Sequence, residues 1–154
     1  MTNELSKVSA TREIPVAAVT IFELLRNPER HTETDATGSV QSVDKGQGIR
    51  EVGDTFTMNM VNADGPYKTQ NEVFAYQQDR VIGWQNQENL ANGVKVGAKW
   101  LYELEPIDAD NTRVTLTYDP TEIDNPEVQK LAKEKFAVES QLEDSLGKLA
   151  EAVA

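Results

Sequence analysis

The chain has 154 residues, no cysteine and a formal net charge of -11 at pH 7. A chain of this length forms one domain on ordinary size grounds, and it buries about 70% of its unfolded surface without needing a disulfide. The acidic charge argues against nucleic acid and anionic membranes as partners, since both require a basic face. Residues 1–9 hold no apolar signal-peptide core, and no apolar run reaches the ~18 residues of a membrane span, which predicts a cytoplasmic protein.

Apolar and polar residues alternate along residues 5–14, which predicts a half-buried strand with Arg12 on its inner parity. Pro15 ends this strand because proline has no backbone N–H to donate. Residues 16–25 then carry apolar side chains at helical spacing until an Asn-Pro pair stops the helix. Residues 28–34 have room for one more short helical turn.

The middle of the chain returns to the period of a strand. Six further strands are expected, at residues 39–44, 54–62, 67–76, 81–87, 94–104 and 114–118. Segment 94–104 is predicted to be the longest of them, and turn residues at 62–66 predict a tight hairpin. No Gly-Lys-Ser or Gly-Lys-Thr follows Gly46, Gly48 and Gly53, so these glycines indicate turns between strands rather than a phosphate-binding loop.

Residues 125–154 are predicted to form one long helix, the element around which the sheet is organised. Asn125 is a favourable N-cap, Pro126 suits the first helical position, and no later proline interrupts the segment. Apolar residues form one stripe, except that Lys135 and Glu139 fall within it. Two explanations stay open: both side chains are solvated beyond the edge of the sheet, or they stand over a cavity mouth and contact the polar head of a ligand.

A strongly twisted sheet with one apolar face needs a cover, and only the C-terminal helix is long enough. Because a curved sheet cannot close fully onto a straight helix, this pattern predicts an internal apolar cavity, the usual form of a small-molecule site. The side chains expected around it by inward parity are Phe56, Met58, Trp84, Trp100, Tyr102 and Tyr118. The aromatic side chains have two interpretations, ordinary core or contact with a ligand, because a buried tryptophan or tyrosine must satisfy its polar group.

Four segments carry a family resemblance: the run 11–25, Asn-Pro-Glu-Arg-His at 27–31, Val-Gly-Asp-Thr-Phe at 52–56 and Asp-Asn-Thr-Arg-Val at 110–114. Together they resemble the START/Bet v1-like superfamily, also called SRPBCC, and within it the polyketide cyclase/dehydrase and lipid-transport branch. The resemblance implies an α+β helix-grip fold in a single domain over residues 1–154. In this fold a seven-stranded curved antiparallel sheet surrounds a long C-terminal helix, with two short helices between the first and second strands.

The same resemblance implies that the chain binds a small hydrophobic ligand, such as a lipid, a polyketide or an aromatic molecule, in the internal cavity. It leaves open whether the protein is a polyketide cyclase or dehydrase. The alternative is a non-catalytic interaction protein, since some helix-grip relatives act on chaperones or ribosomes. We expect a monomer without cofactor or stable membrane insertion. The candidate ligand-binding residues are Phe56, Met58, Met60, Asn71, Val73, Trp84, Trp100, Tyr102, Tyr118, Lys135, Glu139 and Leu142.

His31 is the only histidine, and its polar sequence neighbours predict an exposed side chain. One histidine without any cysteine does not supply the ligands of a zinc site. If the protein is an enzyme, the cavity would fold a poly-β-carbonyl chain for aldol cyclisation or dehydration. Arg12, Asn71 or a tyrosine hydroxyl would then polarise one carbonyl. Nothing in the spacing of the residues identifies a base.

Overall fold

The computed structural model describes residues 6–35, 40–45, 48–62 and 65–154. The strands are β1 (Val8–Ile14), β2 (Val40–Lys45), β3 (Thr55–Asn62), β4 (Gly65–Gln77), β5 (Val81–Asn89), β6 (Val94–Lys95), β7 (Lys99–Asp108) and β8 (Asn111–Asp119). The helices are α1 (Ala18–Leu25), the 3-10 helix η1 (Pro28–Glu33), α2 (Pro126–Leu131), the π-helix η2 (Ala132–Phe136) and α3 (Glu139–Ala152).

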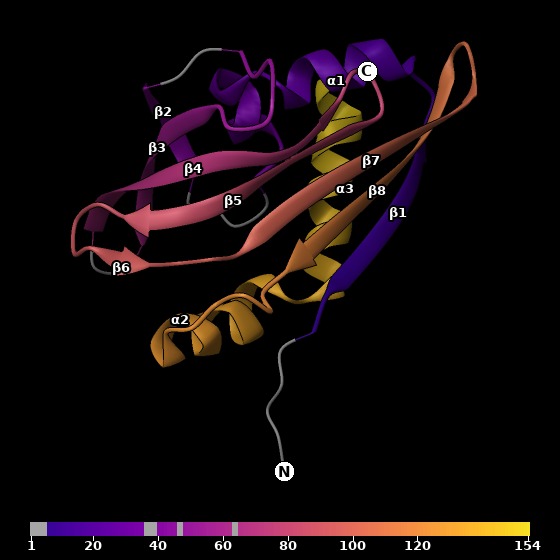
Figure 1. Cartoon of the computed structure of the whole chain (residues 1–154). Helices are drawn as coiled ribbons and strands as arrows, with labels where there is room; N and C mark the ends of the chain where they lie inside the picture. The colour runs from indigo at the N-terminus through magenta and orange to yellow at the C-terminus, as the bar shows by residue number, and fades with distance from the viewer. Residues whose placement is uncertain (1–5, 36–39, 46–47, 63–64) are drawn as a thin grey trace.

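The strands form one curved antiparallel sheet with the helices on one side of it (Figure 1). The order along the sheet is β1-β8-β7-β5-β4-β3-β2, and the short strand β6 pairs with β5 outside this path. Each predicted strand has a counterpart in the sheet, although segment 94–104 corresponds to the two strands β6 and β7. Helices α1 and η1 lie between the first and second strands as expected. The predicted α+β helix-grip architecture is therefore confirmed.

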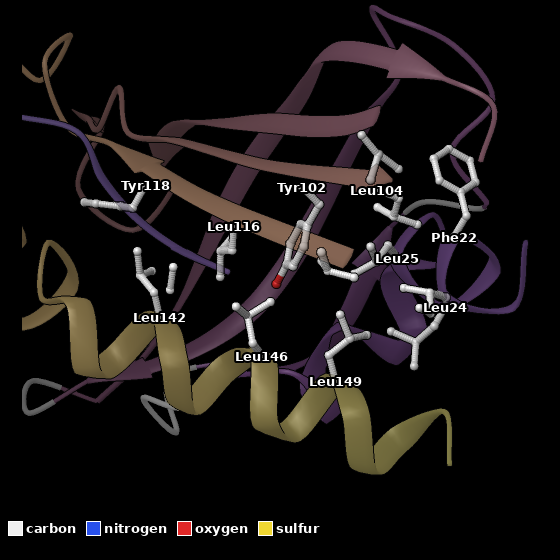
Figure 2. Packing of buried hydrophobic residues seen from close by; sticks show 14 of the residues in the cluster. Phe22, Leu24, Leu25, Tyr102, Leu104, Leu116, Tyr118, Leu142, Leu146 and Leu149 are labelled. Carbon is white, nitrogen blue, oxygen red and sulfur yellow. The ribbon is translucent and has the colours of Figure 1, made fainter. Parts of the chain in front are cut away.

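Helix α3 closes one part of the core by packing against β1 and β8. Its Leu142, Leu146 and Leu149 are spaced by four and three residues, so they share one helical face, and each is at most 1% exposed. Figure 2 shows this face directed toward Leu116 and Tyr118 of β8. Full burial of a leucine contributes ~1.5–3 kcal/mol, which makes this contact a main source of stability.

The short helices α1 and η1 complete the same core. Phe22, Leu24 and Leu25 of α1 are 0% exposed, and Figure 2 shows the two leucines near the Leu149 end of α3. The turn η1 begins after Asn27, whose side-chain oxygen accepts a hydrogen bond from a backbone N–H two residues later at 3.1 Å. The predicted short turn after the Asn-Pro pair is thus confirmed, and a side-chain hydrogen bond caps its N-terminus.

The prediction of one unbroken C-terminal helix is wrong. Helices α2 and α3 point in different directions (Figure 1), because the backbone leaves helical geometry at Ala137 (φ -82°, ψ 51°) and is extended at Val138 (φ -126°, ψ 121°). Just before the break, the N–H of Ala137 donates to the carbonyl of Ala132 at 2.6 Å, a bond that spans five residues and is typical of a π-turn. The break contains neither proline nor glycine, so a local signal for it is missing.

Tertiary contacts supply the reason for the break. The ring of Phe136, at the end of η2, lies with its centroid 6.2 Å from Trp100 and 6.1 Å from Tyr118. Each such pair contributes ~0.5–1.5 kcal/mol, whereas ordinary residues differ in helix propensity by at most ~0.7 kcal/mol. The break makes Glu139 the exposed first residue of α3, where a negative charge suits the helix dipole. The exposure of Glu139 agrees with a solvated side chain, and the side chain of Lys135 lies outside the described part of the structure.

The predicted longest strand, 94–104, is divided. Strands β6 and β7 are separated at Gly97, which has a φ of 96° and donates its N–H to the carbonyl of Asn86 at 2.7 Å. A β-carbon at Gly97 would lie 2.8 Å from the carbonyl oxygen of Glu122, so both the backbone angle and the close approach require glycine. The longest strand is instead β4, with 13 residues.

Candidate functional site

A cavity of about 420 Å³ lies between the inner face of the sheet and the helices η1, α2 and α3. This volume falls in the range of ~300–1,000 Å³ that is usual for small-molecule sites. The sheet and its loops contribute Val40, Phe56, Met58, Met60, Tyr67, Thr69, Asn71, Trp84, Asn86, Asn89, Asn92, Val94, Val96, Ala98, Trp100, Tyr102 and Tyr118 to the wall. The helices and their flanks contribute His31, Thr34, Asp35, Asn125, Glu127, Val128, Leu131, Ala132, Phe136, Gln141 and Ser145.

Most of the predicted ligand-binding residues line this cavity, namely Phe56, Met58, Met60, Asn71, Trp84, Trp100, Tyr102 and Tyr118. Val73 and Leu142 do not line it, because they are packed in the core with 1% and 0% of their surface exposed. The exposed Glu139 also lies outside the wall, which corrects its expected place at the mouth. Alternation identifies the inner face of a strand, but packed core and cavity lie on that same face.

One aromatic group in the wall is built around Trp84. The imidazole of His31 stacks on the indole of Trp84 with 4.5 Å between ring centroids and 17° between planes. The ring of Phe56 meets both of them edge-on, at 5.4 Å and 5.9 Å, and Tyr102 lies 5.9 Å from the indole on another side. These contacts hold all four rings in fixed orientations.

A second aromatic group is formed by Trp100, Tyr118 and Phe136. The centroids of Trp100 and Tyr118 are 4.5 Å apart, and Phe136 reaches both from η2. The chain contains two tryptophans, and both line the cavity. Their indole groups therefore report directly on whatever occupies it.

A strip of hydrogen-bonded amides crosses the inner face between these groups. The indole N–H of Trp100 donates to Oδ1 of Asn86 at 3.0 Å, and Nδ2 of Asn86 donates to Oδ1 of Asn71 at 2.6 Å. Nδ2 of Asn71 then donates to the backbone carbonyl of Thr69 at 3.2 Å. Nδ2 of Asn71 also donates to the backbone carbonyl of Phe56 at 3.5 Å. An amide nitrogen carries two hydrogens, so Nδ2 of Asn86 can use its second one to donate to a polar group of a ligand.

The expectation that His31 is exposed is wrong. The residue is 7% exposed, and its Nε2 lies 2.8 Å from the carbonyl oxygen of Leu25. Burial lowers the pKa of His31 to about 4, although the bond to Leu25 acts in the opposite direction, so the imidazole is neutral at pH 7. Its polar neighbours mark the outer side of η1, where Arg30 and Glu33 pair at 2.8 Å, while the turn directs His31 inward.

The phenol groups of the wall stay protonated at neutral pH. Burial raises the pKa of Tyr102 to about 12, and a hydrogen bond with Thr34 opposes this change only partly. Burial also raises the pKa of Tyr118, and the negative charge of Asp119 adds to the effect. Both phenols therefore act as hydrogen-bond donors or acceptors rather than as bases.

The cavity opens between α2 and the loop that joins β5 to β6. Glu127 and Leu131 of α2 line the cavity and are exposed, as is Asn92 of the loop. Helix α2 buries none of its residues, and in Figure 1 it stands beside the β6 end of the sheet, away from α3. Glu127 and Asp35 place carboxylates in the wall.

The structure removes Arg12 from the candidate catalytic groups. Arg12 is opposite Val114 in the β1–β8 ladder, but it is exposed and does not line the cavity. Its guanidinium lies beside α3, 3.8 Å from the position that a β-carbon on Gly147 would take. The inner parity of Arg12 was correctly predicted, but α3 covers this end of the sheet and separates it from the cavity.

Several wall residues were missed for two different reasons. Thr69 and Asn86 share the parity of Asn71 and Trp84, so alternation could have identified both of them. The positions of His31 and Phe136 depend on how η1 and the helix break turn these side chains, and the sequence carries no periodic signal for either. Within the described ranges, no three His, Asp or Glu side chains gather as a metal site, and no helix is long and apolar enough to cross a membrane.

Fold and cavity together define a helix-grip protein with an internal, mainly apolar site. Residues 6–154 match the family described as polyketide cyclase/dehydrase and lipid transport, and the chain belongs to this family. The resemblance to this branch of the START/Bet v1-like (SRPBCC) superfamily is thereby confirmed.

Known proteins support the same fold. An uncharacterized protein of Mycobacterium tuberculosis (Rv0088) is 28% identical over 113 residues, which are 73% of this chain and 47% of the relative. The chain thus spans about half the length of the curated relatives that it matches. A solution structure from Arthrobacter aurescens has a TM-score of 0.73 at 14% identity, covering 96% of this chain and 85% of the other. The ZhuI aromatase/cyclase from Streptomyces sp. R1128 has a TM-score of 0.66 at 12% identity, covering 96% and 92%.

Proposed function

We propose that this protein binds a small, neutral, mainly apolar molecule with a planar ring in the cavity. The observation that carries the proposal is the combination of two fixed aromatic groups with a strip of amide donors inside about 420 Å³. Rings of this kind bind planar ligands by stacking and edge contacts. A few placed polar groups in an apolar wall are the usual means of orienting such a ligand.

The charges of the wall favour a neutral ligand over an anionic one. Asp35 and Glu127 contribute carboxylates, and the described side chains of the wall include no lysine or arginine. Burial of an anion without a partner costs several kcal/mol. We therefore expect a neutral aromatic molecule to bind more tightly than a fatty acid of similar apolar area.

Binding is favoured over catalysis by the protonation states inside the cavity. The name of one structural neighbour describes an aromatase/cyclase, and a cyclisation needs a base as well as a group that polarises the carbonyl. The phenols of Tyr102 and Tyr118 are available as donors. A histidine with a pKa of about 4 is a weak base at neutral pH. We therefore place carrier or binding activity first and polyketide cyclisation second.

An interaction protein is less well supported. The large apolar residues exposed in the described part of the chain are Val19, Val52, Leu90, Ile107 and Leu131. They come from five different segments, and Figure 1 places α2 at the opposite end of the molecule from α1 and the β7–β8 hairpin, which lie close to each other. A docking surface for a partner would instead need a contiguous patch. The monomeric state and the cytoplasmic location stay predictions from the sequence.

Titration with naphthalene tests the proposed function. We expect the two indole N–H signals in the NMR spectrum to shift as naphthalene binds, because both tryptophans line the cavity. Ser145 lines the cavity from α3, whereas Ser140 of the same helix is exposed. The variant Ser145→Leu fills part of the cavity and should lower affinity by about tenfold or more, and the matched variant Ser140→Leu should leave it unchanged.

Two results would contradict the proposal. Indole signals that do not move at saturating naphthalene would show that the cavity does not accept a planar apolar ligand. Equal affinities for Ser145→Leu and Ser140→Leu would place any binding elsewhere on the protein. Native mass spectrometry of the protein purified from cells adds an independent check, since a carrier retains a bound small molecule.

A further inference from the structure

The buried histidine has one nitrogen without a hydrogen-bond partner among the residues that the structure describes. Nε2 of His31 bonds the Leu25 carbonyl, and a carbonyl oxygen only accepts, so Nε2 carries the proton and Nδ1 carries a lone pair. Among the described residues, every fully enclosed side-chain nitrogen or oxygen has a hydrogen-bond partner. Nδ1 has none, so it must be reachable by solvent or ligand. Because His31 is nearly buried and lines the cavity, we take the cavity as the side from which Nδ1 is reached.

The ring that carries this lone pair is held on several sides. The Leu25 carbonyl fixes one edge at 2.8 Å, Trp84 covers one face at 4.5 Å, and Phe56 contacts the ring edge-on at 5.4 Å. An acceptor fixed in this way loses little entropy when a ligand binds, so the hydrogen bond contributes more of its strength to affinity. Because His31 belongs to an aromatic group, a ligand ring that packs against this group has one of its edges near Nδ1.

The chemistry of the imidazole limits what it can do to a ligand. A phenol has an ordinary pKa of about 10, and the His31 imidazolium has a pKa of about 4. Transfer of a proton from a phenol to His31 is thus strongly unfavourable, and the ligand keeps its proton. The imidazole therefore accepts a hydrogen bond from a neutral hydroxyl or N–H group.

We infer that His31 is a specificity-determining residue that selects planar ligands with a hydroxyl or N–H donor on the ring edge over ligands of the same shape without one. This inference rests on the proposed function. An ether oxygen in the same place would set two acceptors against each other and leave the Nδ1 lone pair unsatisfied. Sites built around a hydrogen bond discriminate well against analogues that cannot form it.

Three probes of related shape test the selection: naphthalene, 2-naphthol and 2-methoxynaphthalene. In the native protein we expect 2-naphthol to bind about tenfold more tightly than either of the others, which corresponds to one hydrogen bond. The variant His31→Phe keeps a ring against Trp84 and Phe56 but has no lone pair. It should bind naphthalene within about twofold of the native affinity and lose the preference for 2-naphthol.

A measurement on the native protein removes the dependence on that variant. His31 is the only histidine, so the two imidazole nitrogens are assigned in the ¹⁵N spectrum without mutagenesis. We expect 2-naphthol to shift the Nδ1 signal strongly and naphthalene to leave it nearly unchanged. If naphthalene binds, but 2-naphthol shows neither tighter binding nor an Nδ1 shift, the selection by His31 is wrong and the proposed function stands. If none of the probes binds, the proposed function fails and this inference fails with it.

Discussion

The inner face of the sheet has two halves that are filled in different ways. Under α3, near β1 and β8, Leu116, Leu142, Leu146 and Leu149 are at most 1% exposed. Under η1 and α2, near β3 to β5, the wall residues surround a cavity of about 420 Å³, and α2 buries no residue of its own. Both halves belong to one sheet with the same alternation of side chains. The difference lies in the cover, since α3 lies flat on the sheet, whereas α2, which precedes the break at Ala137, runs in a different direction.

This contrast separates stability from function within one small domain. The packed half buries its leucines almost completely, while the open half keeps aromatic surface available that a closer cover would bury. We expect the packed half to unfold only with the whole molecule and α2 to open independently.

Replacing a leucine by alanine should lower the free energy of unfolding far more in the packed half than in the open half. We expect Leu146→Ala to lower the free energy of unfolding by about 2–5 kcal/mol, because it creates a void in the packed half. The matched variant Leu131→Ala, from α2, should cost less than about 0.5 kcal/mol, because this side chain is 48% exposed. Urea unfolding of both variants measures the difference. Similar losses would mean that α2 supports the fold as much as α3 does.

Acid should weaken the fold through His31. The pKa of this residue is about 4 in the folded protein and 6.5 in the unfolded chain, so the unfolded state binds more protons between these values. The free energy of unfolding should therefore be highest above pH 6.5 and fall by up to about 3 kcal/mol toward pH 4. Carboxyl groups also titrate in this range, and His31→Phe is the control because it removes the histidine part alone. Parallel pH profiles for both proteins would rule out the neutral buried imidazole.

Removal of the helix caps should change stability least, and it tests whether α2 opens independently of α3. Oδ1 of Asn125 accepts from the N–H groups of Glu127 and Val128 at 2.9 Å and 3.3 Å. We expect Asn125→Ala to speed hydrogen exchange in α2 about fivefold, the effect of about 1 kcal/mol, and to leave α3 unchanged. The comparison variant Asn27→Ala removes the cap of η1 and should lower global stability, because η1 borders the cavity but also contacts α1 and α3. An α3 that exchanges faster in Asn125→Ala would contradict the independence of α2.

Much of the fold follows from patterns that are short in sequence. Apart from the division of segment 94–104, the strands were predicted, because alternation acts between near neighbours. The inward parity of Phe56, Met58 and Trp100 and the turn after the Asn-Pro pair were predicted for the same reason. Parity also led to the correct face of the sheet for Val73. It could not distinguish Val73, which is packed, from Asn71, which lines the cavity, since both point to one side.

Local period and the need to bury apolar surface were enough to assign the inward face of the strands and to predict a helical cover at the C-terminus. The place where this cover breaks follows from contacts that form only in the folded protein. The break at Ala137 depends on Phe136 meeting Trp100 and Tyr118, and the burial of His31 depends on Trp84, which lies far along the chain. Contacts between distant segments leave no periodic trace in either segment, and they are the contacts that shape this cavity.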